Sequence, residues 1–240
     1  MICLVGADTP IGKILSTIKG PVSYKAHGQK PDPDADILIY AGENKDTVHA
    51  TDILKSYFNL FKGRFIYISS YHVYGHGFKA LTEYSNLRPI SEFGKMQAIH
   101  ENMVRERNEY VVLRISETYG LKNGGDLVSD ITSRVLNDVP ITGSSTILDF
   151  IYKDDLVRAI NAVIDNNIVC KTLNVGTNIG TSILELSRMI GKIYGKEPIM
   201  NVVEDGSASF NILNADKIRH LTGWVSRVEL KQALPVIKAM

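Results

Sequence analysis

Short apolar runs separated by longer amphipathic stretches fill the first two thirds of the chain. Runs in which almost every residue is apolar are typical of strands buried on both faces of a parallel sheet. The pattern predicts such strands at residues 2–5, 37–40, 65–68 and 111–113, and helices at residues 11–19, 47–61 and 92–107. This alternation predicts an α/β fold built on a Rossmann-type, doubly wound parallel sheet.

The rhythm changes twice along the chain. Residues 28–36 contain Pro31 and Pro33 and are predicted to form a loop where many such sheets carry another helix and strand. After Gly120 we expect a helix at residues 127–136, and a later one that begins with the capping-box pair Ser182 and Glu185. The domains predicted on this basis are a Rossmann core of residues 1–120 to which residues 147–178 return, and a small substrate lobe of residues 121–146 and 179–240.

Composition narrows the class of protein. The chain has 240 residues, 44% of them hydrophobic and 22% charged, and 27 Lys and Arg balance 26 Asp and Glu. This balance argues against a nucleic-acid binder, and a chain of this length needs neither a metal nor a disulfide to hold it together. Cys3 and Cys170 lie in apolar stretches that we interpret as buried strands, which favours a reducing compartment. With no leader sequence and no long apolar run, the expectation is a cytoplasmic protein without a membrane segment.

A glycine-containing turn, residues 6–12, follows the first strand and opens the first helix. Gly6 permits a tight turn, Gly12 permits close packing of the helix on the sheet, and the helix N-terminus offers N–H groups to a pyrophosphate. Thr9 stands where a middle glycine would allow the closest approach of the backbone to phosphate. An ordinary strand-to-helix turn is the alternative, but the position in the chain favours a nucleotide site.

The type of nucleotide is less constrained. An acidic residue at the end of the second strand would indicate NAD, whereas this strand ends in Lys25, Ala26 and His27. Cations suit the 2′-phosphate of NADP, which is therefore slightly favoured over NAD. Solvated surface residues explain Lys25 and His27 equally well.

Together with these features, several later segments resemble the extended short-chain dehydrogenase/reductase family of NAD(P)-dependent nucleotide-sugar epimerases, dehydratases and reductases. The matching segments are residues 37–42, 66–75, 89–95 with Glu101, 112–114, 119–120, 149–156, 173–176 and 221–224. The resemblance covers nearly the whole chain and implies a Rossmann fold, a nicotinamide dinucleotide, a substrate of the nucleotide-sugar type and a homodimer packed through the helix at residues 92–107. It also implies which residues contact the cofactor: Gly6, Thr9, Pro10, Ile11, Gly12, Lys25, Ala41, Gly42, Ser69 and Ile115.

The same resemblance identifies Ser70 as the active-site serine but shows two replacements. Phe93 stands where the family has its proton-transferring tyrosine, and Gln97 stands where it has the lysine that lowers the pKa of that tyrosine. Neither side chain ionises, so the usual hydride-coupled mechanism should be severely impaired. Lys95 and His100 are poorly placed to substitute, and the aromatic side chains near Ser70, including His72, are interpreted as packing residues.

Two functions follow from these residues. One is an oxidoreductase or epimerase with atypical chemistry that uses Ser70 and an unidentified proton carrier, and the other is a non-catalytic nucleotide-binding or regulatory homologue. Arginines that grip a nucleotide diphosphate in the family are replaced by Leu148 and by the run Ser207, Ala208 and Ser209, which weakens the expectation of a nucleotide-sugar substrate.

Overall fold

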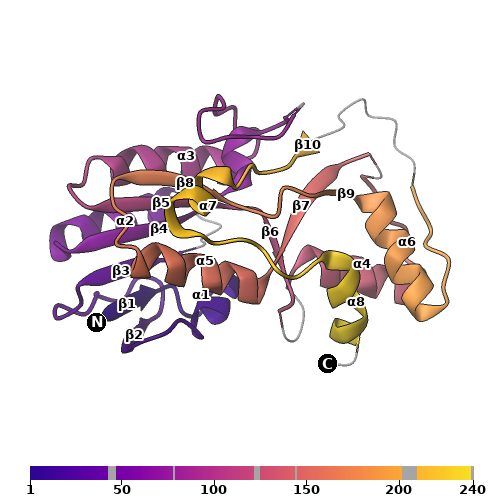
Figure 1. The fold of residues 1–240 in the computed structure, drawn as a ribbon, viewed down its shortest axis with the longest axis horizontal. Helices are drawn as coiled ribbons and strands as arrows, with labels where there is room; N and C mark the ends of the chain where they lie inside the picture. The colour runs from indigo at the N-terminus through magenta and orange to yellow at the C-terminus, as the bar shows by residue number, and fades with distance from the viewer. Residues whose placement is uncertain (43–46, 78, 122–124, 144, 202–209, 239–240) are drawn as a thin grey trace.

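A computed structural model describes residues 1–42, 47–77, 79–121, 125–143, 145–201 and 210–238. Within these ranges, six parallel strands form one sheet in the order β2-β1-β3-β4-β5-β8, as Figure 1 shows. Its strands are β1 (Ile2–Val5), β2 (Val22–Lys25), β3 (Ile37–Tyr40), β4 (Arg64–Ser70), β5 (Tyr110–Ile115) and β8 (Lys171–Val175). The doubly wound α/β fold expected from the sequence is confirmed.

Helices cover both faces of this sheet (Figure 1). On one face lie α2 (Thr47–Leu60) and α3 (Glu92–Arg105), and on the other lie α1 (Pro10–Leu15), α5 (Lys153–Asp165) and α7 (Asp216–Thr222). Leu54 and Val104 pack with Phe65 in the first core, and Leu15 and Ile160 pack with Ile66 in the second. Successive residues of β4 therefore serve opposite cores, which explains why its sequence is apolar without a break.

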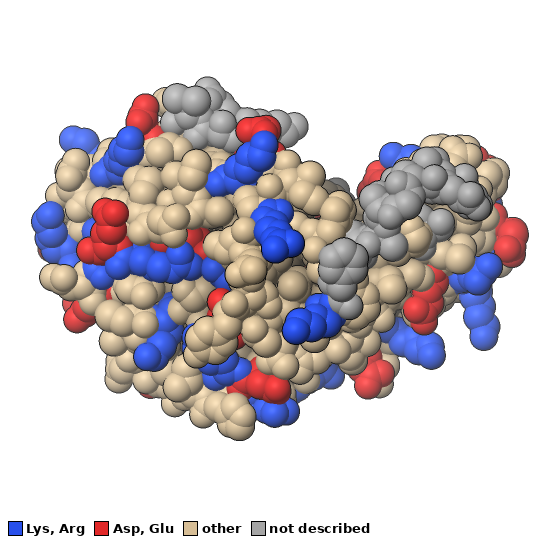
Figure 2. Space-filling view, turned by 90° about the horizontal axis from the view of Figure 1, so that it is seen from above, with Lys and Arg blue, Asp and Glu red and all other residues tan. Residues whose placement is uncertain are grey.

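A second lobe is built around a smaller sheet. Its strands are β6 (Glu117–Tyr119), β7 (Ile147–Tyr152), β9 (Gly180–Ser182) and β10 (Phe210–Asn211), and its helices are α4 (Leu127–Leu136), α6 (Ile183–Tyr194) and α8 (Leu230–Lys238). In the space-filling view of Figure 2 this lobe is set off from the larger one by a notch, and basic and acidic side chains both occur across the visible face. The segment at residues 147–178 runs through both lobes, because β7 belongs to the small sheet and β8 to the large one.

Two sequence-based expectations need correction. The first helix ends at Leu15 rather than at residue 19, because the Ser16 and Thr17 hydroxyls bond back to the carbonyls of Lys13 and Ile14. Cys170 is exposed and precedes β8 with a φ of 52°, so it is not part of a buried strand, whereas Cys3 is buried in β1 as expected. The chain between β2 and β3 is a loop without helix or strand, as its prolines predict.

Candidate functional site

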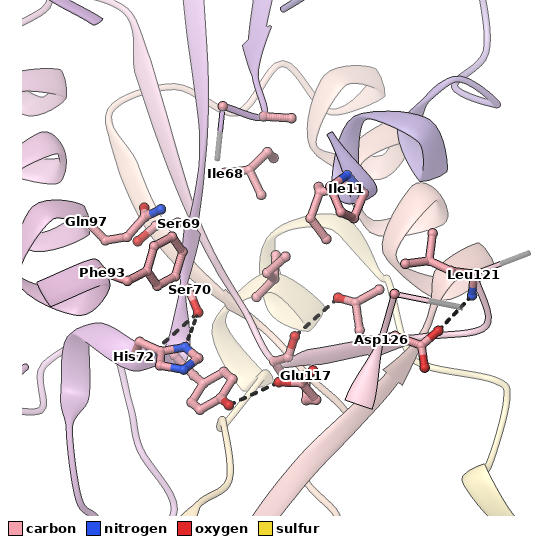
Figure 3. Close-up of a pocket in the computed structure, with 18 residues that line it drawn as sticks. Ile11, Ile68, Ser69, Ser70, His72, Phe93, Gln97, Glu117, Leu121 and Asp126 are labelled. Carbon is pink, nitrogen blue, oxygen red and sulfur yellow. Dashed lines mark hydrogen bonds between the residues drawn. The ribbon is translucent and has the colours of Figure 1, made fainter. Parts of the chain in front are cut away.

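A cavity opens at the carboxyl ends of β1, β3, β4 and β5, the edge at which open α/β sheets bind ligands (Figure 3). Most of the predicted site residues line it: Pro10, Ile11, Ala41, Gly42, Ser69, Ser70, Phe93, Gln97 and Ile115. Gly6, Thr9, Gly12 and Lys25 do not line it. The topology thus brings together side chains that are more than 100 residues apart in the sequence.

The glycine turn packs directly on the end of β3. Gly6 has a φ of 86°, and a Cβ atom there would lie 2.6 Å from the carbonyl oxygen of Ala41. A Cβ atom on Gly12 would lie 1.8 Å from the carbonyl oxygen of Gly6. Neither position accepts a side chain, so the two glycines set the tight turn and the close helix packing that the sequence predicts.

Thr9 holds this turn in place from its buried position. Its hydroxyl accepts a hydrogen bond from the backbone N–H of Gly12 at 3.0 Å, which caps α1, and lies 2.8 Å from the carbonyl oxygens of both Gly6 and Ala41 as donor. The sequence suggested only that Thr9 obstructs the approach of phosphate. The cap is recognisable in retrospect, because Thr9 precedes a proline at the first helical position.

Lys25 serves the turn through its backbone. Its carbonyl oxygen accepts hydrogen bonds from the N–H groups of Gly6 and Ala7, at 2.9 and 3.0 Å. The neighbouring His27 contacts the Tyr40 hydroxyl through Nε2 at 2.8 Å, and burial lowers the pKa of its imidazole despite the nearby carboxylate of Asp8. The basic residues after β2 are therefore partly engaged in packing, and the choice between NAD and NADP stays a prediction.

Gln97 is almost fully buried on α3 and belongs to a chain of hydrogen bonds. Its Oε1 accepts from the Tyr67 hydroxyl at 2.6 Å, and that hydroxyl lies 3.0 Å from Nδ1 of His100. His100 in turn contacts the Thr51 hydroxyl through Nε2 at 3.0 Å. Burial raises the pKa of Tyr67 and lowers the pKa of His100 to about 4, so this chain is neutral at physiological pH.

Phe93 and His72 form one wall of the cavity next to Ser70. The two rings are 5.5 Å apart between centroids and nearly perpendicular, and Nδ1 of His72 lies 2.9 Å from the Ser70 hydroxyl (Figure 3). Burial lowers the pKa of His72. The sequence assigned His72 to packing, and it gave no sign that the imidazole contacts the serine.

Behind the cavity, Ser69 is tied to a buried carboxylate. Its hydroxyl donates to Glu101 at 2.6 Å, and Glu101 also accepts from Arg114, at 2.6 Å from Nη2, and from Arg105 at 2.6 Å. Although burial alone would lower the pKa of Arg114, its hydrogen bonds and attraction to Glu101 raise it above the ordinary value. This network fixes the end of β4, and therefore the position at which Ser70 leaves the sheet.

Two carboxylates border the cavity on the side of the small lobe. Glu117 accepts a hydrogen bond from the Tyr71 hydroxyl at 3.0 Å, while Asp126 caps α4 and accepts from the N–H groups of Leu121 and Ser129. No lysine or arginine is found among the described residues that line the cavity. Sequence reasoning missed both acids, although Glu117 follows the end of β5 closely enough to be placed at this edge.

A family model for the NAD dependent epimerase/dehydratase family matches residues 40–176, more than half of the chain. The chain belongs to this family. The resemblance drawn from the sequence motifs is thereby confirmed, while the matched segment itself includes both Phe93 and Gln97.

Individual relatives agree with this membership. The chain is 24% identical over 182 residues to the uncharacterized UDP-glucose epimerase YtcB of Bacillus subtilis, a match that covers 71% of this chain and 58% of that protein. It therefore spans less than two thirds of the length of this curated relative.

Among solved structures, the UDP-glucuronic acid 4-epimerase of Bacillus cereus, in complex with UDP-glucuronic acid and NAD, is 21% identical with a TM-score of 0.82 and covers 99% of each chain. RMD of Pseudomonas aeruginosa, complexed with NADPH, is 17% identical with a TM-score of 0.79 and covers 100% of this chain and 99% of that one. At these identities the likeness establishes the fold. Within the described residues of this chain, none of the helices is both long and apolar enough to cross a bilayer.

Proposed function

We propose that this family member binds a nicotinamide dinucleotide at the carboxyl edge of its large sheet and carries out atypical oxidoreductase chemistry on a sugar of the nucleotide-sugar type. The observation that carries the proposal is the cavity itself. Ile11, Ala41 and Ser70 all line it, although they are far apart in the sequence. Solved relatives with the same fold hold NAD or NADPH, and some hold UDP-sugars.

The residues present fit such a cofactor. The side chains at the mouth of the glycine turn are small or apolar, namely Pro10, Ile11, Ala41 and Gly42, so a flat ring system meets no buried charge there. When bound, the dinucleotide supplies the hydride acceptor or donor. Gln97 lines the cavity with a neutral carboxamide, and Phe93 offers an aromatic wall.

In this proposal, Phe93 and Gln97 stand at the positions where the family has its tyrosine and lysine. Gln97 accepts a hydrogen bond from Tyr67, which holds the carboxamide in place as a neutral group. These replacements also favour a second candidate, a non-catalytic nucleotide-binding or regulatory homologue. Transfer of hydride in a single turnover separates the two, because a pure binding protein does not change the absorbance of the nicotinamide.

For the substrate, we propose that the small lobe, built around β6, β7, β9 and β10, receives a nucleotide sugar above a dinucleotide-binding core built on the large sheet. Leu148, at the position of one phosphate-gripping arginine, is buried in the core of the small lobe, and Ser207 to Ser209 lie outside the described residues. Glu117 and Asp126 border the cavity, and its lining has no lysine or arginine within the described ranges, so the part of the substrate that we propose enters there is the sugar rather than the diphosphate. We also place the protein in the cytoplasm as a homodimer packed through α3.

Calorimetry with NAD⁺, NADH, NADP⁺ and NADPH tests the cofactor. We expect binding of at least one dinucleotide, with NADP(H) slightly preferred, and we expect Ile11→Glu to weaken it about tenfold or more because a carboxylate beside the pyrophosphate repels it. Ser16→Glu is the matched control, since it adds the same charge at an exposed position of the same segment. Absence of binding at millimolar ligand would remove the cofactor and with it the proposed enzyme.

A further inference from the structure

Ser70 and His72 form a hydrogen-bonded pair on the wall of the cavity. The Ser70 hydroxyl lies 2.9 Å from Nδ1 of His72, and the same oxygen accepts the backbone N–H of His72 at 3.4 Å. An oxygen that accepts this N–H still carries its own proton, which it can donate to Nδ1. Both side chains line the cavity, and His72 packs edge-on against Phe93, the residue at the former tyrosine position.

We propose that His72, acting through the Ser70 hydroxyl, is the proton acceptor and donor that takes over from the missing tyrosine. The proposal rests on the proposed function, since the hydride in the reaction belongs to the dinucleotide. It assigns His72 the Nε2–H tautomer in the resting protein, so that Nδ1 is the free base facing Ser70.

The proton balance follows from the pair. When a substrate alcohol is oxidised, its O–H bond breaks and the proton passes to Ser70 Oγ, while the proton of Ser70 passes to Nδ1 of His72. The two electrons of that O–H bond form the new C=O bond, and the adjacent C–H hydrogen leaves as hydride, for which the oxidised dinucleotide is the acceptor. Ser70 ends as it began and His72 ends as an imidazolium, so reduction of a ketone runs through the same atoms in reverse.

The surroundings of His72 favour a neutral imidazole. Burial lowers its pKa from the ordinary 6.5, so it is a base at physiological pH. Tyr71, beside it, directs its hydroxyl to Glu117 on β6. On α3, which packs against the 3₁₀ turn Tyr71–Tyr74, the charged groups nearest to Phe93 are Glu92 and Lys95, and these pair with each other at 2.6 Å on the surface. The charges of these elements are thus engaged with partners other than His72.

NMR of the histidine ring nitrogens tests the pair without any ligand. Among the signals of the six histidines, that of His72 is identified by its loss in His72→Gln. His76→Gln, at an exposed position of the same loop, is the control. We expect Nδ1 of His72 to be unprotonated at neutral pH and its resonance to shift in Ser70→Ala, which removes the donor. An Nδ1–H tautomer, or a resonance that Ser70→Ala leaves in place, would overturn the proposal.

Catalysis is then measured with bound dinucleotide and a panel of UDP-glucose, UDP-glucuronic acid and dTDP-glucose. We expect His72→Gln to lower the rate of hydride transfer by about 10²–10⁴-fold with unchanged affinity for the dinucleotide, and His76→Gln to behave as wild type. In the oxidation direction the wild-type rate should fall as pH drops and His72 becomes protonated. If wild type binds the dinucleotide but shows no turnover, or if His72→Gln turns over at the full rate, the role of His72 is overturned. If wild type binds no dinucleotide, the proposed function is overturned instead.

Discussion

Gln97 contributes a buried hydrogen-bond acceptor, rather than a charge, to the wall of the cavity. Its carboxamide oxygen meets the Tyr67 hydroxyl at 2.6 Å, and both side chains are buried. A cation at this position would face a hydroxyl and a neutral His100 in place of a countercharge. The neutral amide of Gln97, which we propose stands at the position of the family's lysine, is therefore matched by the residues around it, and position 97 is part of a neutral network.

Removing this acceptor should destabilise the protein. We expect Gln97→Leu to lower the free energy of unfolding by about 1–3 kcal/mol, because the Tyr67 hydroxyl loses its closest partner in a buried setting. Urea denaturation measures the change. Lys95→Gln on the same helix is the matched control and should stay within about 0.5 kcal/mol of wild type, since Lys95 is exposed and its pair with Glu92 lies at the surface.

Tyrosine and lysine at positions 93 and 97, where the sequence resemblance predicts them, should restore the usual chemistry if the rest of the cavity is competent. In a His72→Gln background, which lacks the proposed acid and base, we expect Phe93→Tyr combined with Gln97→Lys to raise hydride transfer by about 10²–10⁴-fold, the contribution of a positioned acid or base. Stopped-flow absorbance of the nicotinamide measures it, with Phe93→Leu and Gln97→Lys as the comparison pair without a phenol. Equal rates in the two double variants would show that the cavity cannot use a tyrosine at position 93.

Sequence reasoning found the residues of the site better than their contacts. Positions at or just after a strand end, such as Ser70 and Ala41, could be placed at the cavity because parallel strands share one carboxyl edge. The contact between Ser70 and His72 depends on the 3₁₀ turn that begins at Tyr71, which brings residues two apart together. No periodic pattern reports such a turn, so His72 was assigned to packing.

At the scale of elements, the glycine turn and the end of β3 behave as one unit. Gly6 and Gly12 leave no room for a side chain, and Thr9 joins the turn to Ala41 by a hydroxyl whose distances to Gly6 O and Ala41 O are both 2.8 Å. The helix that follows has only six residues, so its position depends more on this cap than on its own length.

Thr9→Val tests the cap with little change in shape. We expect a loss of about 0.5–2 kcal/mol in the free energy of unfolding, since the variant leaves the Gly12 N–H without its acceptor, together with weaker binding of the dinucleotide. Thermal denaturation and calorimetry measure the two effects. Thr9→Ser keeps the hydroxyl and should lie close to wild type, and equal stability of the two variants would contradict the role given to the cap.

The elements themselves were predictable to different degrees. β1 was predicted with its observed limits because all four of its residues are buried and apolar. The small sheet was not predicted, because β6 and β9 have three residues each and β10 has two, too few to show a periodicity. Pairing with β7, which is distant in sequence, defines these strands.

At the scale of the whole molecule, Asp149 links the two sheets. It lies on β7 of the small lobe, yet its carboxylate accepts hydrogen bonds from the backbone and hydroxyl of Thr177, just after β8 of the large sheet, and from the backbone of Leu213. Burial, the largest influence, raises the pKa of Asp149 to about 6, and these hydrogen bonds oppose the rise. We therefore expect the stability contributed by this junction to depend on pH.

The sign of that sensitivity follows from proton binding. Between the ordinary pKa of 3.8 and about 6, the folded protein holds a proton on Asp149 that the unfolded chain has released. Stability from this group is complete below 3.8 and is lost as pH rises through 6, by about 3 kcal/mol in total. Because the carboxylate keeps its donors when ionised, the lobes remain joined at neutral pH, at lower stability.

Asp149→Asn isolates this contribution, since an amide does not titrate. We expect the variant to be less stable than wild type at pH 4, because it has lost one acceptor atom. The difference in the free energy of unfolding should shrink by up to about 3 kcal/mol between pH 4 and pH 7, because only wild type gives up a proton at position 149. Urea denaturation across this pH range measures the difference in the free energy of unfolding between the two proteins. The carboxylates that both proteins contain contribute equally to each and cancel from this difference. Asp52→Asn, changed at a side chain that is 70% exposed, should follow wild type at every pH. A gap that widens with pH would mean that the donors from Thr177 and Leu213 outweigh burial, and that the junction holds Asp149 as a charge.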